Sequence, residues 1–311
     1  MLNDLDELIK QNGPPIALID NWTDKYIGYA VWDFDETLMW THEGLFLNDI
    51  IQKSASLELV QNILDKWKSN SNDISAMSYI NYNFKNILYP HIPFKQHKDK
   101  FPLLFFAKPK KLVKYKIQHL SNSLSEKFSL HKDILDLTTY KQIIQKIKKE
   151  LLSGNVYQVN FTMPKYFLMN NNALASYLYF RNIAKPKFGY YLNYKQFKVL
   201  SFSPEQFFKK TNKFIYTYPM KGTINRDKNP IKDNELKLKL THSIKDNAEH
   251  LMIVDLMRND IGKIAKIGSV NVKNKYYIES YPTVHQMISC ISGELINNIN
   301  EIDIIKALFP G

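Results

Sequence analysis

The stretch Tyr218 to Thr223, YPMKGT, contains residues that could hold a primary amine in one place. It follows an aromatic run, Phe214 to Tyr218, whose alternation predicts a buried strand. Pro219 restricts the backbone shortly before Lys221, and a Gly-Thr pair comes directly after the lysine. The pattern therefore predicts a lysine whose amine is positioned by its neighbours in the chain.

A second group of charged residues lies on a predicted helix, Asp246 to Asp260, with the sequence DNAEHLMIVDLMRND. Glu249 is expected in the first turn of this helix. Core helices rarely carry many charges without a use, because burying a charge is costly. Here the far end is crowded with polar and charged side chains, namely Asp255, Arg258, Asn259 and Asp260.

Other polar residues stand in or beside predicted strands. The period of two along VYQVNFT places Gln158, Asn160 and Thr162 on one face, which is either the wall of a cleft or a solvent-facing side. Glu205 follows a proline in SPEQFF and could project into the same cleft, although a lone glutamate is usually at the surface. His285 lies in TVHQMISCISGEL, where a hydrogen-bonded core histidine is the simple alternative.

The segment IGYAVWDFDETL contains Asp33 and Asp35 in a pattern that resembles the first motif of haloacid dehalogenase-type phosphatases. In that family the first Asp is the nucleophile and the second is the acid/base. Those enzymes also need a downstream Gly-Asp-rich loop for magnesium, and no such loop follows in this sequence. The alternative is a strand with Trp32 and Phe34 inward and both aspartates toward water.

Composition limits the possible partners. The chain has 311 residues and a formal charge of +12, yet only three of its 42 basic residues are arginine, the residue that most often reads bases and phosphates in pairs of hydrogen bonds. Nucleic acid is therefore not an expected partner. The lysine-rich segment from residue 108 to residue 116 is interpreted as a solvated face.

The cysteine count and the termini indicate the compartment. Cys290 is the only cysteine, which rules out an internal disulfide and a cysteine metal cage, and it falls in a predicted core strand. The amino terminus, MLNDLDELIK, lacks a signal-peptide pattern, and no apolar run is long enough to span a bilayer. We expect a cytoplasmic protein without a membrane partner.

The periodicity of the chain predicts an ordered set of elements. Residues 1–45 are expected to form strands and hairpins, and residues 48–83 one or two amphipathic helices. The polar run His119 to Lys132 is interpreted as a linker, with a domain boundary near residue 130. Further predicted elements are strands at 101–106 and 112–117, a helix at 139–153 that stops at Gly154, a hairpin of 188–194 with 197–202, a charged loop up to Lys237, and a strand from Ile267.

Taken together and in order, several motifs resemble the chorismate-utilising enzymes, which include anthranilate synthase component I, aminodeoxychorismate synthase component I, and the isochorismate and salicylate synthases. The motifs are SGNVYQVNFT, SPEQF, YPMKGTINR, DNAEHLMIVDLMRNDIG with GSV, and TVHQMISCISGEL. The resemblance covers residues 139–311 closely and the amino-terminal part loosely. Gln158 stands where water-using members have a lysine, and Lys221 stands where anthranilate synthases usually have alanine. Gln158 therefore matches the ammonia-using members, and Lys221 is similar to the aminodeoxychorismate synthase branch, with anthranilate synthase as the alternative.

The resemblance implies roles for individual residues. Lys221 would add at C2 of chorismate while the C4 hydroxyl leaves, after which ammonia enters at C4 and expels the lysine. Glu205 would protonate the departing hydroxyl, and His285 would contact the leaving or entering group. Glu249 would hold Mg²⁺. The residues implied to line the substrate pocket are Gln158, Gly222 and Thr223.

The resemblance also implies a fold and a partner. The fold is α+β, with two large antiparallel sheets packed together and helices outside. Residues 1–130 would be the region similar to the amino-terminal part of anthranilate synthase component I, and residues 131–311 would be an incomplete chorismate-binding domain. Ammonia would come from a separate glutamine amidotransferase subunit, since nothing in the chain resembles a glutaminase site.

Two departures from the family pattern affect these expectations. Ile224 and Asn225 stand where relatives often have an arginine and a proline. The closing ALFPG matches only the start of a glycine-rich segment that would carry substrate-binding groups and a second magnesium glutamate. We therefore expect residues 1–311 alone to be inactive and at most to bind chorismate weakly, and an inactive binding fragment is a further alternative.

Overall fold

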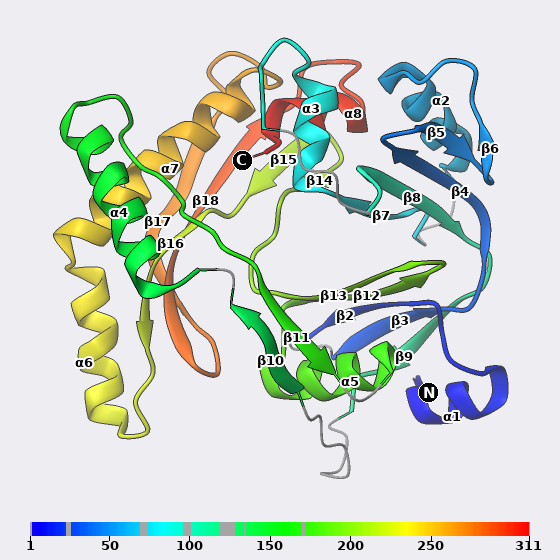
Figure 1. The fold of residues 1–311 in the computed structure, drawn as a ribbon, viewed down its shortest axis with the longest axis horizontal. Helices are drawn as coiled ribbons and strands as arrows, with labels where there is room; N and C mark the ends of the chain where they lie inside the picture. Colours follow the sequence, from blue (N-terminus) through cyan, green and yellow to red (C-terminus); the bar gives the residue numbers. More distant parts are fainter. Residues whose placement is uncertain are drawn as a thin grey trace. The chain divides into compact units, whose positions relative to one another are not determined.

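The computed structural model describes residues 2–22, 26–68, 74–95, 101–118, 128–133, 135–169 and 172–310. Two compact units make up the chain: Met1–Gln118 with Ala184–Gly311, and His119–Ile183. The predicted boundary near residue 130 lies inside the second unit. Helices and mostly antiparallel sheets occur together (Figure 1), so the α+β class is confirmed; in the described residues the strands form four sheets, not two.

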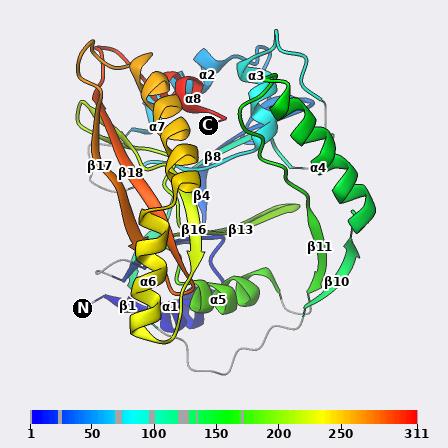
Figure 2. The same ribbon diagram turned by 90° about the vertical axis from the view of Figure 1, so that its left-hand side faces the viewer.

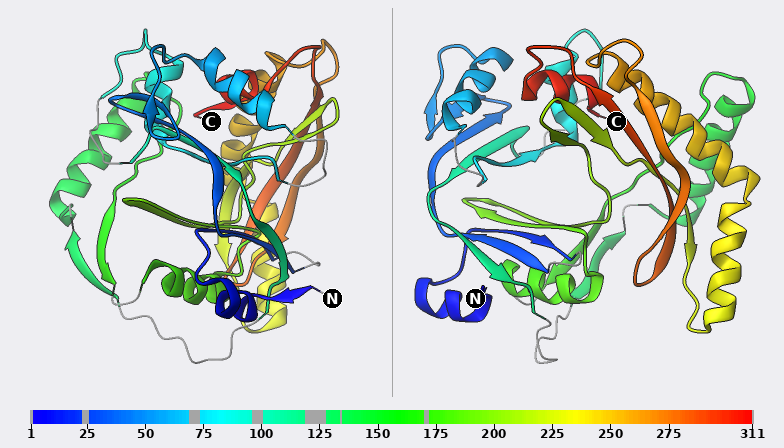
Figure 3. Two further views of the ribbon diagram at one scale, coloured as in Figure 1. Left: turned by 90° about the vertical axis from the view of Figure 1, so that its right-hand side faces the viewer. Right: turned by 180° about the vertical axis from the view of Figure 1, so that it is seen from behind.

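A six-stranded sheet joins the amino-terminal strands to a hairpin from much later in the chain. Its order is β1-β9-β3-β2-β12-β13, and only the β1 to β9 pair is parallel. The predicted hairpin of β12 and β13 is confirmed, and its first strand pairs with β2 (Figure 3). The strands span Asn3–Asp4 (β1), Ala17–Asn21 (β2), Ile27–Val31 (β3), Leu112–Lys116 (β9), Phe188–Tyr194 (β12) and Phe197–Ser203 (β13).

A five-stranded sheet of order β6-β5-β4-β8-β7 packs against the first sheet. The shared core includes Val31 and Leu192 from the first sheet and Phe105 and Ala107 from the second, all of them buried. These two packed antiparallel sheets match the predicted arrangement. The strands of the second sheet are Phe34–Thr41 (β4), Gly44–Leu47 (β5), Ile50–Ile51 (β6), Met77–Ile80 (β7) and Leu104–Pro109 (β8).

A separate core cluster lies between the second sheet and the helices that cover it. The predicted amphipathic helix appears as α2, Leu57–Trp67, whose first turn is capped by Ser56. It packs with the last helix, α8, Glu301–Leu308, through buried Ile63, Leu64, Ile302 and Ile305. The short η1 and α3, Tyr82–Phe84 and Lys85–Leu88, complete this part of the core.

The third sheet of the first unit is built around β18, Val284–Glu294, which is buried along most of its length. On one side β18 pairs with β17, Asn271–Ser280, and on the other with β15 and β16, Phe214–Thr217 and Met220–Asn225. β14, Lys209–Thr211, extends the sheet beyond β15. Cys290 is buried on β18, as predicted.

Two helices cover one face of this sheet (Figure 2): α6, Pro230–Thr241, and α7, Ile244–Gly262. The prediction of a charged loop up to Lys237 is wrong, because Asn229 caps α6 by accepting hydrogen bonds from the Ile231 and Lys232 N–H groups, and Pro230 suits the first helical position. The predicted helix from Asp246 is confirmed, but it begins at Ile244. Glu249 therefore lies in its second turn, not its first.

The amino-terminal helix α1, Leu5–Asn12, was not expected from the sequence. Asp4 caps it, and Gly13 ends it at a φ of 76°, a conformation that suits glycine. These capping residues outweigh the short apolar runs that indicated strands. Among the described residues, no helix combines the length and the apolar character needed to cross a bilayer.

The second unit contains α4, Leu137–Leu152, a two-stranded sheet of β10 and β11, Phe128–Asp133 and Lys165–Met169, and the helix α5, Ala173–Ala184. The predicted helix ending before Gly154 is confirmed as α4. The predicted strand VYQVNFT is wrong, because residues 156–164 have no regular structure and β10 pairs with the segment that follows them. Of the predicted linker, residues 119–127 lie outside the described part of the chain, and β10 occupies its end.

His250 connects α7 to the sheet beneath it. Its fully buried ring places Nε2 2.8 Å from Ser289 Oγ on β18, and the same oxygen accepts the Tyr276 N–H. Burial lowers the pKa of His250 to about 4, because the protein interior disfavours the charged imidazole.

This environment predicts a pH-dependent stability. Between pH 6.5 and about 4, His250 binds a proton in the unfolded chain but stays neutral in the folded chain. The free energy of unfolding therefore falls as the pH falls. In urea unfolding at pH 7 and pH 5, we expect the loss of stability to be about 1–2 kcal/mol smaller in His250→Gln than in the wild type. Equal losses in the two proteins would contradict this assignment.

Candidate active site

Lys221 lies at an irregularity in the pairing of β16 with β18. Met220 pairs with Ile288 and Thr223 pairs with Gln286, so β16 uses one more residue than β18 over this interval. The extra residue makes a β-bulge at Lys221 and Gly222. Bulges change the direction of the side chains they carry and are common next to active sites.

Gly222 is required by this geometry. Its φ is 83°, and a Cβ built on it would lie 3.1 Å from Asp246 Cβ on α7 and 3.2 Å from Leu240 Cδ1 on α6. Both values are closer than ordinary van der Waals contact. The bulge that carries Lys221 is therefore pressed against the two helices, and only a residue without a side chain fits there without a shift.

Glu205 approaches the start of the same strand. It follows β13, where its N–H donates to Ser203 Oγ at 3.1 Å, and its Oε1 accepts the Met220 N–H at 3.3 Å. Loss of hydration among neighbouring atoms raises the pKa of Glu205, although the carboxylate keeps an exposed edge. The Met220 N–H and the positive charge of Lys221 oppose this rise. The structure thus places the Glu205 carboxylate against the backbone of Met220, the residue before Lys221.

A pocket of about 360 Å³ lies beside this pair in the first unit. Pro204 and Gln206, the two neighbours of Glu205 in the chain, line it, whereas Glu205 and Lys221 are not among its lining residues. One wall carries Lys187, whose Nζ is 2.8 Å from Glu279 Oε1. The other lining residues include Lys209, Tyr218, Met220, Tyr277 and Ile288.

His285 and Thr223 are on opposite faces of the sheet. Side chains alternate along β18, and Gln286 pairs with Thr223, whereas His285 pairs with Ile224 and Ser280. His285 is only 2% exposed, on the face covered by α6. Direct contact of this imidazole with a substrate stays a prediction, and it would require one of its present hydrogen bonds to break.

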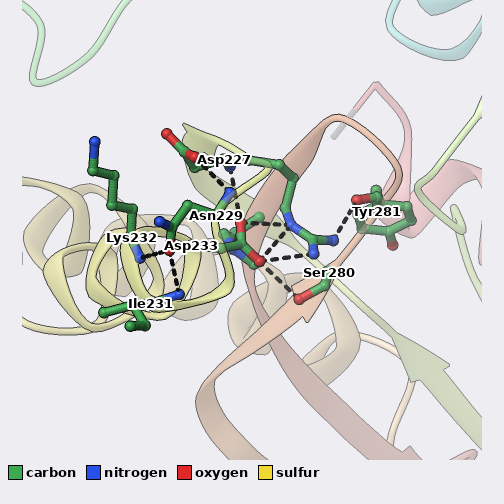
Figure 4. Close-up of polar contacts among 9 residues, drawn as sticks. Asp227, Asn229, Ile231, Lys232, Asp233, Ser280 and Tyr281 are labelled. Atoms are coloured by element: carbon green, nitrogen blue, oxygen red, sulfur yellow. Dashed lines mark hydrogen bonds and ion pairs between the residues drawn. The ribbon is translucent and has the colours of Figure 1, made fainter.

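Both ring nitrogens of His285 are engaged, by Asp233 and Ser280, which are labelled in Figure 4. Nε2 lies 3.0 Å from Asp233 Oδ1 on α6, and Nδ1 lies 2.8 Å from Ser280 Oγ on β17. Arg226 holds Asp233 from the other side, with Nη2 2.7 Å from Oδ2. This guanidinium is the main reason that the pKa of Asp233 is well below its usual range. The environment is that of a hydrogen-bonded core histidine.

Sequence reasoning missed Asp233 and Gln286. Asp233 was placed in a loop, so its position facing β18 could not be anticipated. Gln286 shares its sheet face with Thr223, and its Oε1 is buried without a hydrogen-bond partner in the described structure. The alternation of β18 alone, which puts neighbouring residues on opposite faces, could have distinguished Gln286 from His285.

Two implied site residues remain. Gln158 belongs to the second unit, in the segment of chain that joins α4 to β11, and is half-buried; its place beside Lys221 stays a prediction. Glu249 is half-buried on α7, with Oε1 3.7 Å from Lys245 Nζ. No group of three or more His, Cys, Asp or Glu residues suited to a metal occurs in the described part of the chain. Mg²⁺ is commonly held by one or two carboxylates together with water and substrate oxygens, so Glu249 can supply one ligand, and its role stays a prediction.

The two aspartates of the phosphatase-like motif are at the surface. Asp33 and Asp35 flank the half-buried Phe34, and each pairs with a lysine, Lys110 at 3.3 Å and Lys108 at 3.8 Å. Such exposed pairs contribute little to stability. The strand β4 belongs to an antiparallel sheet, and the alternation expected for a simple strand is confirmed.

The chain belongs to the chorismate-binding enzyme family, because the family model for chorismate binding enzymes matches residues 15–311. Aminodeoxychorismate synthase component 1 of Escherichia coli (strain K12) is 37% identical over 192 residues, which are 61% of this chain and 42% of that protein. Anthranilate synthase component 1 of Saccharolobus solfataricus is 32% identical over 184 residues, 59% of this chain and 44% of that protein. The chain thus spans about two fifths of the length of these two relatives.

A solved structure supports the fold. The crystal structure of anthranilate synthase component I from Streptococcus pneumoniae TIGR4 matches with a TM-score of 0.75 at 17% identity, over 93% of this chain and 73% of that chain. At this level of identity the likeness concerns the fold. It agrees with the α+β architecture described above.

The packing of Gly222 predicts a large cost for a single methyl group. In urea unfolding, Gly222→Ala is expected to destabilise the protein by about 1–3 kcal/mol more than Gly268→Ala. Gly268 is a matched control, because it has a similar φ of 77° but nothing within 4 Å of a built Cβ, so its substitution introduces backbone strain without overlap. Equal costs would show that Asp246 and Leu240 move aside freely.

Proposed function

We propose that this chain carries the catalytic residues for the amination of chorismate to 4-amino-4-deoxychorismate, with Lys221 as the nucleophile and Glu205 as the acid. The observation that supports it most is the position of Glu205 at the β16 bulge. Its Oε1 accepts the Met220 N–H, and the positive charge of Lys221 favours its ionised form. A relative named aminodeoxychorismate synthase component 1 has 37% identity over the matched residues, which favours this branch of the family.

The two side chains have complementary tasks in this proposal. The Lys221 amine, in its neutral form, forms a bond to C2 of chorismate, both conjugated ring double bonds shift, and the bond from C4 to its hydroxyl oxygen breaks. Glu205 delivers a proton to that oxygen, so that water leaves. Ammonia then forms a bond to C4 while the bond between Lys221 and C2 breaks, and the excess proton returns to the carboxylate.

The environment of Glu205 suits an acid. Loss of hydration raises its pKa, so a larger fraction of the carboxyl group carries a proton near neutral pH than for a fully hydrated glutamate. The opposing effects of Lys221 and the Met220 N–H limit this rise. The proposed proton donor thus lies against the backbone of Met220, one residue before the proposed nucleophile.

The choice of ammonia over water rests on Gln158, which stands where water-using relatives have a lysine. The ammonia would be supplied by a glutamine amidotransferase partner. Mg²⁺ with Glu249 as one ligand also belongs to the proposal. No step is assigned to the ion, because no group of three or more His, Cys, Asp or Glu residues suited to a metal occurs among the described residues.

Anthranilate synthase is the second candidate, because a relative with that name is 32% identical over 184 residues. The two products differ in the ring position that receives nitrogen and can be distinguished directly. Anthranilate is fluorescent, whereas 4-amino-4-deoxychorismate becomes p-aminobenzoate after treatment with the lyase.

The test measures both products with the longest form of the gene product that contains residues 1–311, supplied with chorismate, ammonium and Mg²⁺. We expect p-aminobenzoate after the lyase is added. Anthranilate fluorescence in its place would support the second candidate. Inorganic phosphate released from small phosphomonoesters would restore the phosphatase interpretation.

Substitution of the proposed nucleophile should separate chemistry from binding. Lys221→Ala is expected to lower kcat by at least about 100-fold with little change in the affinity for chorismate, because the amine acts in bond formation. Lys228→Ala, which removes an exposed lysine from the segment after β16, is the matched control and should keep near wild-type kcat. Near wild-type turnover in Lys221→Ala would refute the role of the lysine.

A further inference from the structure

Ser280, His285 and Asp233 form a continuous line of hydrogen bonds across three elements of the first unit (Figure 4). Ser280 Oγ on β17 is 2.8 Å from His285 Nδ1 on β18, and His285 Nε2 is 3.0 Å from Asp233 Oδ1 on α6. A hydroxyl, a base and a group that orients the base are the parts of an activated nucleophile, whatever their order in the chain. The amination proposed above does not use this arrangement.

The surroundings of Asp233 determine where the hydrogen atoms lie in this line of hydrogen bonds. Its carboxylate accepts the Arg226 Nε–H at 2.8 Å and the Asp227 N–H at 3.0 Å, so its pKa lies well below the ordinary value and it remains an anion. An anionic carboxylate can only accept hydrogen bonds, so the neutral ring of His285 must carry its hydrogen on Nε2. Nδ1 then has a free lone pair, and the Ser280 hydroxyl donates to it.

The two ends of the line differ in their access to solvent. His285 is buried and Asp233 is half-buried, whereas Ser280, the last residue of β17, is exposed. A base shielded from water keeps its orientation, while the hydroxyl it contacts is open to a reagent. Arg226 adds rigidity, because it also donates to the Tyr281 carbonyl oxygen at 3.0 Å, next to Ser280 in the chain.

We propose that Ser280 is a nucleophilic serine, a site of covalent acylation or phosphonylation by activated esters, with His285 as its general base and Asp233 as the residue that positions the base. The ligand class is an electrophilic acyl or phosphonyl ester small enough to reach the end of β17. This site is separate from the proposed amination chemistry, since Glu205 and Lys221 take no part in it.

The step is balanced with a fluorophosphonate as the reagent. A bond forms between Ser280 Oγ and phosphorus while the bond between phosphorus and fluorine breaks, and fluoride leaves with the electron pair. The hydroxyl proton moves to His285 Nδ1 and then to solvent. No oxidant, metal or further reactant is needed.

The experiment treats the folded chain with a biotin-linked fluorophosphonate and locates the adducts by peptide mass spectrometry. We expect Ser280 to be labelled at least about 100-fold faster than the exposed Ser54, the internal comparison, in keeping with general-base assistance. Labelling of Ser280 no faster than that of Ser54 would overturn the proposal, and this comparison needs no variant.

Isosteric substitution tests the positioning role of Asp233. Asp233→Asn replaces the anionic carboxylate with a neutral amide, so the imidazolium that forms when His285 Nδ1 takes the Ser280 proton loses the negative charge that stabilises it. We expect labelling at Ser280 to slow by about 100-fold, while Ser54 is unaffected. Asp227→Asn is the matched control, because its carboxylate in the same segment accepts from the Asn229 N–H, and it should label like the wild type.

Folding of each variant is checked by its circular dichroism spectrum and its urea midpoint. Equal labelling of Ser280 in folded Asp233→Asn and in the wild type would contradict the role of Asp233. If Asp233→Asn does not fold, the comparison of Ser280 with Ser54 in the wild type decides the proposal alone.

Discussion

The contact of Gly222 with α6 and α7 is the constraint on which the candidate site depends. The strand β16 can bulge at Lys221 because Gly222 adopts a φ of 83°, and the helices can pack on the sheet because no Cβ stands 3.1 Å from Asp246. A larger residue would have to push back the helix that carries Glu249 or flatten the bulge that carries Lys221. The direction of the lysine and the position of the helix are thus settled by one residue.

The alternation of β18 divides the remaining functional candidates between two faces. The face covered by α6 and α7 holds His250 with Ser289 and His285 with Asp233. These pairs tie the helices to the sheet through two buried imidazoles, whose hydrogen bonds would be costly to lose. The other face carries Thr223 and Gln286. A substrate bound there would meet a carboxamide from β18, and the imidazole of His285 would lie beneath the sheet.

Much of this could be predicted from the sequence, because local patterns decided it. The β12 and β13 hairpin, the helices α2, α4 and α7, and the buried strand with Cys290 follow from periodicity and capping residues. The ordered motifs predicted the family. The helix α6 was missed although Asn229 and Pro230 are a capping signal, since the charged residues after them suggested a loop.

Other features depended on pairing that no local pattern reveals. The strand expected at VYQVNFT is absent, because its hydrogen-bond partner would have to come from elsewhere in the chain and β10 pairs with residues 165–169 instead. The bulge at Lys221 is visible only in the register of β16 against β18. The separation of His285 from Thr223 follows from the same register.

The central claim is that Lys221 attacks chorismate while Glu205 protonates the leaving hydroxyl, and trapping the covalent intermediate tests it most directly. The protein would be mixed with chorismate in the absence of ammonia, quenched rapidly in acid, digested and examined by mass spectrometry. We predict an adduct on Lys221 whose mass equals chorismate less one water. Failure to detect this adduct in a preparation that forms aminated product once ammonium is added, or an adduct on another residue, would contradict this account.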